Sequence, residues 1–140
     1  MTATIARTTD IATCLGLRHT VFTLEQGVSP ADEVDDRDGD AIHLLAMLGG
    51  RPVGTARLLT DGATGKIGRV CVLPDQRGTG LGAALIRAAV TEFRAMPGIA
   101  AVKLGAQIHA LGFYHRLGFA ATGPVYSDAG IDHRDMLLML

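Results

Sequence analysis

The sequence contains no tryptophan, and aromatic residues make up only 4% of its 140 residues. It also lacks a basic surplus, because 13 lysines and arginines stand against 14 acidic residues and leave a formal net charge of −1. Proteins that bind nucleic acid or an anionic membrane by charge carry a clear excess of basic residues. The composition therefore predicts neither nucleic acid nor a membrane as a partner.

Cysteine is scarce too, with only Cys14 and Cys71 in the chain. These two cysteines and the five histidines form no metal-ligand spacing, so we expect no metal site. Two cysteines far apart in the sequence are typical of a protein in a reducing compartment. The first ten residues lack the apolar core of a signal peptide. No apolar run reaches the length of a membrane-spanning helix. We therefore expect a cytoplasmic protein.

Apolar residues, in contrast, make up 48% of the sequence, which is enough to build a core in one domain spanning residues 1–140. Their spacing alternates between the periods of strands and helices. It predicts strands at residues 3–7, 41–48, 53–60, 66–73, 100–106, 119–126 and 133–140, and helices at residues 11–22, 81–95 and 110–117. A β-meander followed by at least one parallel crossover indicates an α/β fold, with a mixed, mostly antiparallel central sheet flanked by helices.

Three glycines in five positions, Gly78, Gly80 and Gly82, lie between the third strand of the meander and the next helix. The first N–H groups of a helix have no intrahelical partners, and the helix dipole adds positive charge there. Glycine lets a ligand come close to the backbone because it has no Cβ. The segment therefore predicts a phosphate or pyrophosphate site.

Other interpretations of this glycine loop fit less well. A nucleoside-triphosphate loop needs a Gly-Lys pair that is missing here. The segment from Gly78 to Ala83 matches the dinucleotide fingerprint, but its strand follows a meander, and residues 99–103 lack the acidic residue that would bind the ribose. A tight strand–helix turn without a ligand is the remaining alternative.

The segment Arg77-Gly78-Thr79-Gly80-Leu81-Gly82 resembles the Q/R-x-x-G-x-G/A signature of the GNAT superfamily of acyl-CoA-dependent N-acyltransferases. Residues 110–119, with Tyr114 and Gly118-Phe119, are similar to the second landmark of that superfamily, and the two segments stand in the family's order. The resemblance extends over the element order of the whole chain. It implies the GNAT fold and an acyl-CoA-dependent enzyme.

The resemblance also implies a set of residues that bind acetyl-CoA or coenzyme A. The pyrophosphate would be bound by the segment of Arg77, Gly78, Thr79, Gly80, Leu81, Gly82 and Ala83. Val70, Cys71 and Val72 would pair with the pantetheine arm at the splayed end of a strand, where a bulge is typical. Gln107 and Phe113 would lie beside the cofactor, although many similar proteins have asparagine at the position of Gln107.

Acyl transfer from a thioester to a neutral amine needs a base for the amine and an acid for the leaving thiolate, but no covalent enzyme intermediate. The resemblance places the hydroxyl of Tyr114 near the sulfur, and a phenol remains protonated at neutral pH. Candidates for the base are Glu25, His109 and His133, of which Glu25 would need burial to raise its pKa. We interpret Cys71 as a core residue rather than a nucleophile.

The acidic run at residues 32–40 does not have the ligand spacing of a calcium loop. We interpret it as a solvated loop. The alternative is that its negative charges attract a cationic amine acceptor. The first half of the chain, with Arg18, Glu33, Asp35 and Arg57, is also similar to acyl-homoserine-lactone synthases, which share the GNAT fold but generally lack this glycine loop. When the segment at residues 25–28 is included, the first half of the chain is more similar to a branch of small stand-alone bacterial GNAT proteins than to these synthases.

These observations together predict an N-acetyltransferase that transfers an acetyl group from acetyl-CoA to a small-molecule amine, by direct attack in a ternary complex. Two alternatives stay open: a transferase or signal synthase that uses a longer acyl donor, and a CoA-binding sensor without catalysis. A homodimer is common among similar proteins. The acceptor and the oligomeric state do not follow from the sequence.

Overall fold

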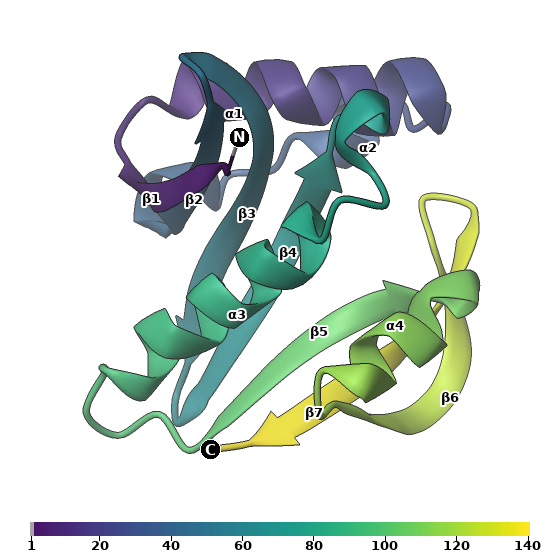
Figure 1. Cartoon of the computed structure of the whole chain (residues 1–140). Helices are drawn as coiled ribbons and strands as arrows, with labels where there is room; N and C mark the ends of the chain where they lie inside the picture. The colour runs from purple at the N-terminus through teal and green to yellow at the C-terminus, as the bar shows by residue number, and fades with distance from the viewer. Residues whose placement is uncertain (1) are drawn as a thin grey trace.

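Figure 1 shows the computed structural model, which describes residues 2–140. Seven strands form one sheet in the order β1-β2-β3-β4-β5-β7-β6. The strands are β1 (Thr4–Thr8), β2 (Ile42–Leu48), β3 (Arg51–Asp61), β4 (Thr64–Val72), β5 (Ala101–Gln107), β6 (Ala120–Asp128) and β7 (Ile131–Met139). Neighbouring strands are antiparallel except for β4 and β5, which are parallel. The predicted mixed, mostly antiparallel sheet is confirmed.

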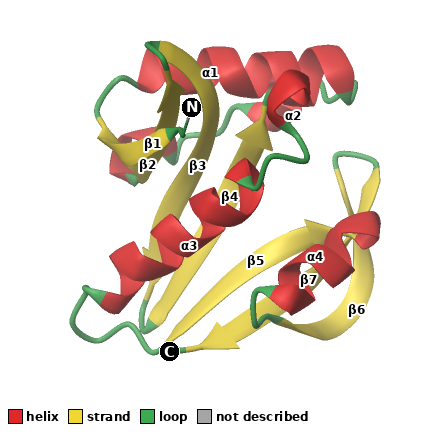
Figure 2. Cartoon of the chain, in the orientation of Figure 1, coloured by secondary structure: helices red, strands yellow, loops and turns green. Residues whose placement is uncertain are grey.

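Helices cover both faces of this sheet (Figure 2). They are α1 (Ile11–Arg18), the π-helix η1 (His19–Glu25), α2 (Pro30–Glu33), α3 (Leu81–Arg94) and α4 (Leu111–Arg116), with short 3₁₀ turns η2 (Asp38–Asp40), η3 (Pro74–Gln76) and η4 (Ile108–Ala110). Within residues 2–140, no helix combines the length and the apolar character needed to cross a bilayer.

The chain between α1 and β2 differs from the prediction. The helix expected to run to residue 22 is α-helical only to Arg18, and then widens into the π-helix η1. The segment at residues 27–40, expected to be a loop, contains α2 and the turn η2. Ser29 caps α2 by accepting a hydrogen bond from the Asp32 amide, and Pro30 occupies its first turn. Capping residues thus start a short helix within an acidic stretch.

The strands β4 and β5 pair only at their beginnings, from Thr64 opposite Ala101 to Ile67 opposite Leu104. Farther along, they diverge in Figure 1. The register between β3 and β4 shifts at this point, and Arg69 takes a left-handed backbone conformation with φ of 50°. This irregularity is the expected bulge, and it places residues 70–72 at an edge that β5 does not cover.

The main core lies between the sheet and α3, whose buried residues include Leu85, Ala89 and Phe93. The opposite face of β4 packs on α1, where Cys71 contacts Leu17 in a second apolar cluster. Cys71 is only 4% exposed, and burial raises the pKa of its thiol to about 12. The interpretation of Cys71 as a core residue is confirmed.

Candidate active site

The glycine loop forms an open start to α3. Gly78 and Gly80 have φ of 78° and 88°, values that residues with a Cβ rarely adopt. A Cβ built at either position would meet nothing within 4 Å, so the space above the backbone is open. Gly80 is the N-cap of α3, and no side chain caps the helix there. A ligand can therefore approach this backbone directly.

The amides of this loop are available to a ligand. Among the described residues, no backbone or side-chain acceptor takes a hydrogen bond from the amides of residues 78–83; the first amide bonded along α3 is that of Ala84, 3.0 Å from the Gly80 carbonyl. These donors lie at the positive end of a 14-residue helix. The loop thus fits a diphosphate group, as the sequence predicted.

The side chain of Arg77 joins the loop to two other elements. Its Nε and Nη2 atoms donate to the Val72 carbonyl at 3.2 and 3.1 Å. Its Nη2 also lies 2.6 Å from Oε1 of Glu25, the last residue of η1, and its Nη1 contacts the other oxygen of that carboxylate. The hydrogen bonds from Arg77 lower the pKa of Glu25. Glu25 is therefore a weaker base than an ordinary carboxylate, whereas a catalytic base at this position would need a raised pKa.

A cavity of about 390 Å³ lies where β4 and β5 separate. Its walls come from η1, α2, β4, β5, α4 and the β6–β7 hairpin. The lining residues are Phe22, Gln26, Val28, Asp32, Glu33, Ile67, Gly68, Arg69, Val70, Leu104, Gly105, Gln107, Ala110, Tyr114, Tyr126, Asp128, Ala129, Ile131 and His133. Of the catalytic candidates, Tyr114 and His133 line this cavity.

Tyr114 presents a protonated hydroxyl group to the cavity. Its ring packs edge-on against Phe113 and Phe119, with centroids 5.0 and 6.1 Å away. Within residues 2–140, no hydrogen bond acts on its hydroxyl, and burial raises its pKa to about 12. Tyr114 therefore remains a proton donor at neutral pH.

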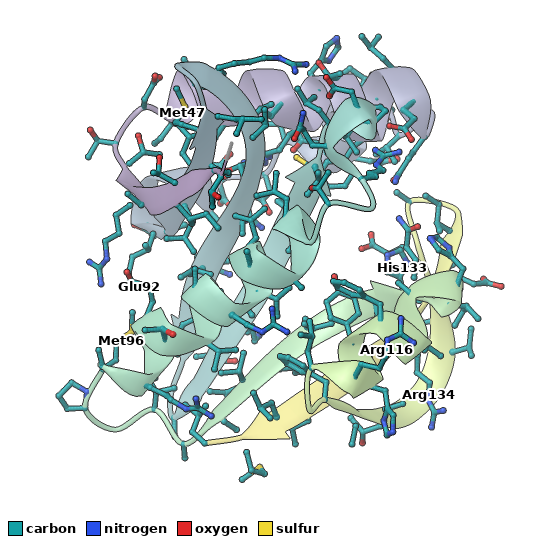
Figure 3. The ribbon with its side chains drawn as sticks, in the orientation of Figure 1. Met47, Glu92, Met96, Arg116, His133 and Arg134 are labelled. Atoms are coloured by element: carbon teal, nitrogen blue, oxygen red, sulfur yellow. The ribbon has the colours of Figure 1, made fainter. Side chains whose placement is uncertain are left out.

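His133 presents a ring nitrogen. Its Nδ1 atom is 2.7 Å from the Ile131 carbonyl, which can only accept, so Nδ1 carries the hydrogen. In the neutral ring, Nε2 then keeps its lone pair and can accept a proton. The ring stacks on Tyr126, with centroids 6.0 Å apart. Figure 3 shows His133 beside the tip of β5, where the register sets it opposite Gln107.

Some of the other predicted residues line this cavity and others do not. His109 is exposed on η4 and does not line it, whereas Gln107 does and donates to Gln26 Oε1 at 3.2 Å. Phe113 lies beside the loop, 3.6 Å from the position of a Cβ on Gly82. Val70 lines the cavity, and Cys71 points to the opposite face.

The acidic run is solvated over most of its length, but the carboxylates of Glu33 and Asp38 are directed into the protein, which the solvated-loop interpretation did not anticipate. Glu33 is 5% exposed and pairs with Nε of Arg18, which is 1% exposed and also donates to Asp38 at 2.7 Å. Asp35 accepts two hydrogen bonds from Arg57, at 2.7 and 3.0 Å. Arg18, Glu33 and Arg57, which are buried, thus belong to a network of opposite charges that extends to the partly exposed Asp35. In the sequence, these residues were grouped only by the similarity of the first half of the chain to acyl-homoserine-lactone synthases. Their contacts were not predicted.

Three cavity residues, Arg69, Tyr126 and Asp128, were not predicted from the sequence. Arg69 interrupts an apolar run on β4, and that single charge was the available indication. Tyr126 donates to Asp135 Oδ1 at 2.8 Å, a pairing across the β6–β7 hairpin that depends on its register.

Comparison with known proteins agrees with this geometry. The family model described as an acetyltransferase (GNAT) domain matches residues 20–140. The chain belongs to the GNAT acetyltransferase family. The predicted fold and the acyl-CoA N-acyltransferase class are thereby confirmed.

Individual relatives cover nearly the whole chain. A Bacillus subtilis protein classed by its name among the acetyltransferases is 39% identical over 127 residues, which are 89% of this chain and 86% of the relative. The solved acyl-CoA N-acyltransferase from Pseudomonas aeruginosa is 34% identical, with a TM-score of 0.84 and 97% of each chain covered. The CoA-dependent acyl-homoserine lactone synthase BjaI, solved with SAM and isopentyl-CoA, is 26% identical, with a TM-score of 0.73 over 92% of this chain and 75% of its own.

Proposed function

We propose that residues 1–140 act as one N-acetyltransferase domain, which transfers the acetyl group of acetyl-CoA to the amine of a small molecule. The observation that carries this proposal is the unbonded set of amides at residues 78–83, next to a cavity lined by Tyr114 and His133. Anion-binding donors, a proton donor and a proton acceptor are thus available within one region of the fold.

Two features support binding of the rest of coenzyme A. Beyond Ile67, β4 has no pairing with β5, so the backbone of Val70 and Val72 can pair with the amides of the pantetheine arm as a strand would. Gln107, at the end of β5, lines the cavity, and Phe113, on α4, lies 3.6 Å from the position of a Cβ on Gly82 in the loop. Arg77 holds the Val72 carbonyl and so fixes the end of β4 relative to the loop.

The residues of the cavity divide the proton transfers between them. Bound acyl-CoA would supply the thioester whose acyl carbon is attacked and the thiolate that leaves. As the N–C bond forms and the C–S bond breaks, Nε2 of His133 takes the proton that the amine loses. The hydroxyl of Tyr114 gives its proton to the departing sulfur. Glu25 remains bonded to Arg77 and positions the loop.

A longer acyl donor is the second candidate, because the similar synthase BjaI was solved with isopentyl-CoA. A non-catalytic sensor of coenzyme A is the third. All three share the cofactor loop and differ in turnover.

Release of free thiol from acetyl-CoA, measured against a panel of small amines, tests the proposal, with calorimetry of CoA binding alongside. Turnover with acetyl-CoA and at least one amine is expected. Turnover confined to longer acyl-CoA donors would favour the second candidate. Tight CoA binding without thiol release for any donor or amine would favour the sensor.

A further inference from the structure

Arg69 is a cation in the cavity wall with an unusual backbone conformation. It lies in the bulge of β4 with φ of 50°, a value that costs free energy for a residue other than glycine, asparagine or aspartate. Such strain is concentrated at functional sites, where the surrounding structure maintains it. The bulge turns Arg69 toward α2, and both Arg69 and Glu33 of α2 line the cavity.

The acidic residues near Arg69 are already occupied by other arginines. Arg18 takes the carboxylate of Glu33, and Arg57 holds Asp35 with two hydrogen bonds. Arg69 is left with the backbone carbonyl of Glu33 at 3.0 Å and with long contacts to the two carboxylates, at 3.4 Å for Asp35 and 3.8 Å for Glu33. Within residues 2–140, no hydrogen bond or ion pair uses its Nη1 atom.

The charge of Arg69 is therefore only partly neutralised in a poorly solvated place. Its side chain is 24% exposed, and burial together with the charge of Arg57 lowers its pKa. An anion entering the cavity would meet a guanidinium group with donors to spare. Such a group gains more from a charged partner than one in bulk water.

We infer that the acceptor of this enzyme carries a carboxylate that Arg69 binds, which makes it a zwitterionic amine of the amino-acid type. This inference rests on the proposed function. The planar guanidinium group suits a carboxylate, whose two oxygens can face two of its nitrogens. His133 lines the same cavity from β7, a different strand, and its Nε2 atom can receive the proton from the amine at the other end of the molecule.

Recognition of an amine with a second positive charge would require acidic groups in the cavity that are not already paired. Asp32 and Asp128 line the cavity as well, but both residues are exposed, so water screens their charges. Arg69 is the half-buried cavity residue whose contacts to carboxylates, at 3.4 and 3.8 Å, are long and whose Nη1 atom has no partner within residues 2–140. A carboxylated amine is therefore favoured over an amine with a second positive charge.

The experiment uses matched ligands and a variant suited to the backbone. Calorimetry on the CoA-saturated protein compares common L-amino acids with their carboxamides and with the amines that lack the carboxyl group. Arg69→Asn removes the guanidinium group and keeps a residue that tolerates a left-handed backbone. Arg7→Gln is the control, because Arg7 pairs with Glu92 and does not line the cavity. Circular dichroism and CoA affinity verify that both variants are folded.

At least one amino acid is expected to bind about tenfold or more tightly than its carboxamide, since hydrogen bonds between charged groups are the strong ones. Arg69→Asn should abolish this preference and Arg7→Gln should keep it. Equal or weaker binding of every amino acid, or a preference that survives in Arg69→Asn, would overturn the inference. Because the experiment measures binding, its result does not depend on thiol release. Binding of the amino acid without turnover would reject the proposed function but would still support recognition of the carboxylate by Arg69.

Discussion

The guanidinium group of Arg77 and the carboxylate of Glu25 form a two-point ion pair, although the residues are 52 positions apart in the chain. The pair links the loop that precedes α3 to the end of the π-helix η1, where Phe22 and the C-cap residue Gln26 line the cavity. The glycine loop and the wall of the cavity are thus joined by an ion pair. Single-turn π-helical segments occur often at functional sites.

We expect Glu25 to act as a positioning residue, and its neutral isostere distinguishes that role from the role of a base. Glu25→Gln keeps a hydrogen-bond acceptor for Arg77 and should change kcat by less than about threefold, far below the 10²-fold expected for a lost base. Glu25→Ala should raise KM for acetyl-CoA more than it lowers kcat. Steady-state kinetics for both substrates would check this, and a collapse of kcat in Glu25→Gln would make Glu25 the base.

His133 should show the opposite behaviour. His133→Gln preserves a polar side chain but removes the nitrogen lone pair, so kcat should fall by roughly 10²-fold or more. Added imidazole should restore part of the rate, because it supplies the missing proton acceptor. His109→Gln, at the exposed histidine outside the cavity, is the matched control and should remain near normal. Equal losses in the two variants would remove His133 from the mechanism.

Tyr114→Phe removes a single hydroxyl group that forms no hydrogen bond within the described residues. Turnover should drop by roughly 10²-fold, the scale of one lost acid catalyst, while CoA affinity and thermal stability stay close to wild type. Thiol release and calorimetry on the same preparation would show both. A nearly unchanged kcat would mean that the thiolate leaves without help from Tyr114.

Gly80→Asp places a side chain and a negative charge in the open space over the loop amides. Coenzyme A binding should be lost or weakened by at least about tenfold, since the introduced charge opposes the diphosphate. Gly62→Asp is the matched control, because Gly62 also has a positive φ, 59°, and open surroundings but lies in the β3–β4 turn. Unchanged affinity in folded Gly80→Asp would reject the cofactor site.

Asp35 makes the stability of the fold depend on pH, because its contribution is lost in acid. Hydrogen bonds from Arg57 hold its pKa at about 2, below the ordinary 3.8, so folding favours the ionised form. This contribution is complete above about pH 4 and is lost as the pH falls toward 2, because the unfolded chain then binds the proton more tightly. Urea unfolding of Asp35→Asn should vary less with pH across this window than wild type. Asp36→Asn, next to it in the chain, should follow wild type.

The sequence could predict what depends on local chemistry. Period-2 and period-3.6 patterns located the strands and the helix α3, since each element must bury one face. The glycines at positions 78 and 80 indicated the loop, because a left-handed backbone and open amides need residues without a Cβ. Tyr114 and His133 came from a resemblance and from residue type. Both line the cavity, whereas His109, of the same type as His133, does not.

Contacts between distant segments were beyond such reasoning. The pairing of Arg18 with Glu33 and Asp38 draws these two carboxylates out of an otherwise exposed segment, because the cost of burying each charge is offset only by a partner from elsewhere in the chain. The same holds for Glu25, whose pKa depends on Arg77. Arg69 faces the cavity only because a bulge, set by pairing with β3, reverses its direction.

The order of the strands and of the helices α1, α3 and α4, and the open start of α3, were thus determined by the sequence alone, since each follows from neighbouring residues. Which histidine reaches the cavity, which carboxylates are neutralised and which arginine keeps donors for a ligand were decided by the tertiary structure. The separation of β4 from β5 creates the cavity, and the ion pairs around it fix the charges that a ligand meets. Both depend on packing between residues far apart in the chain.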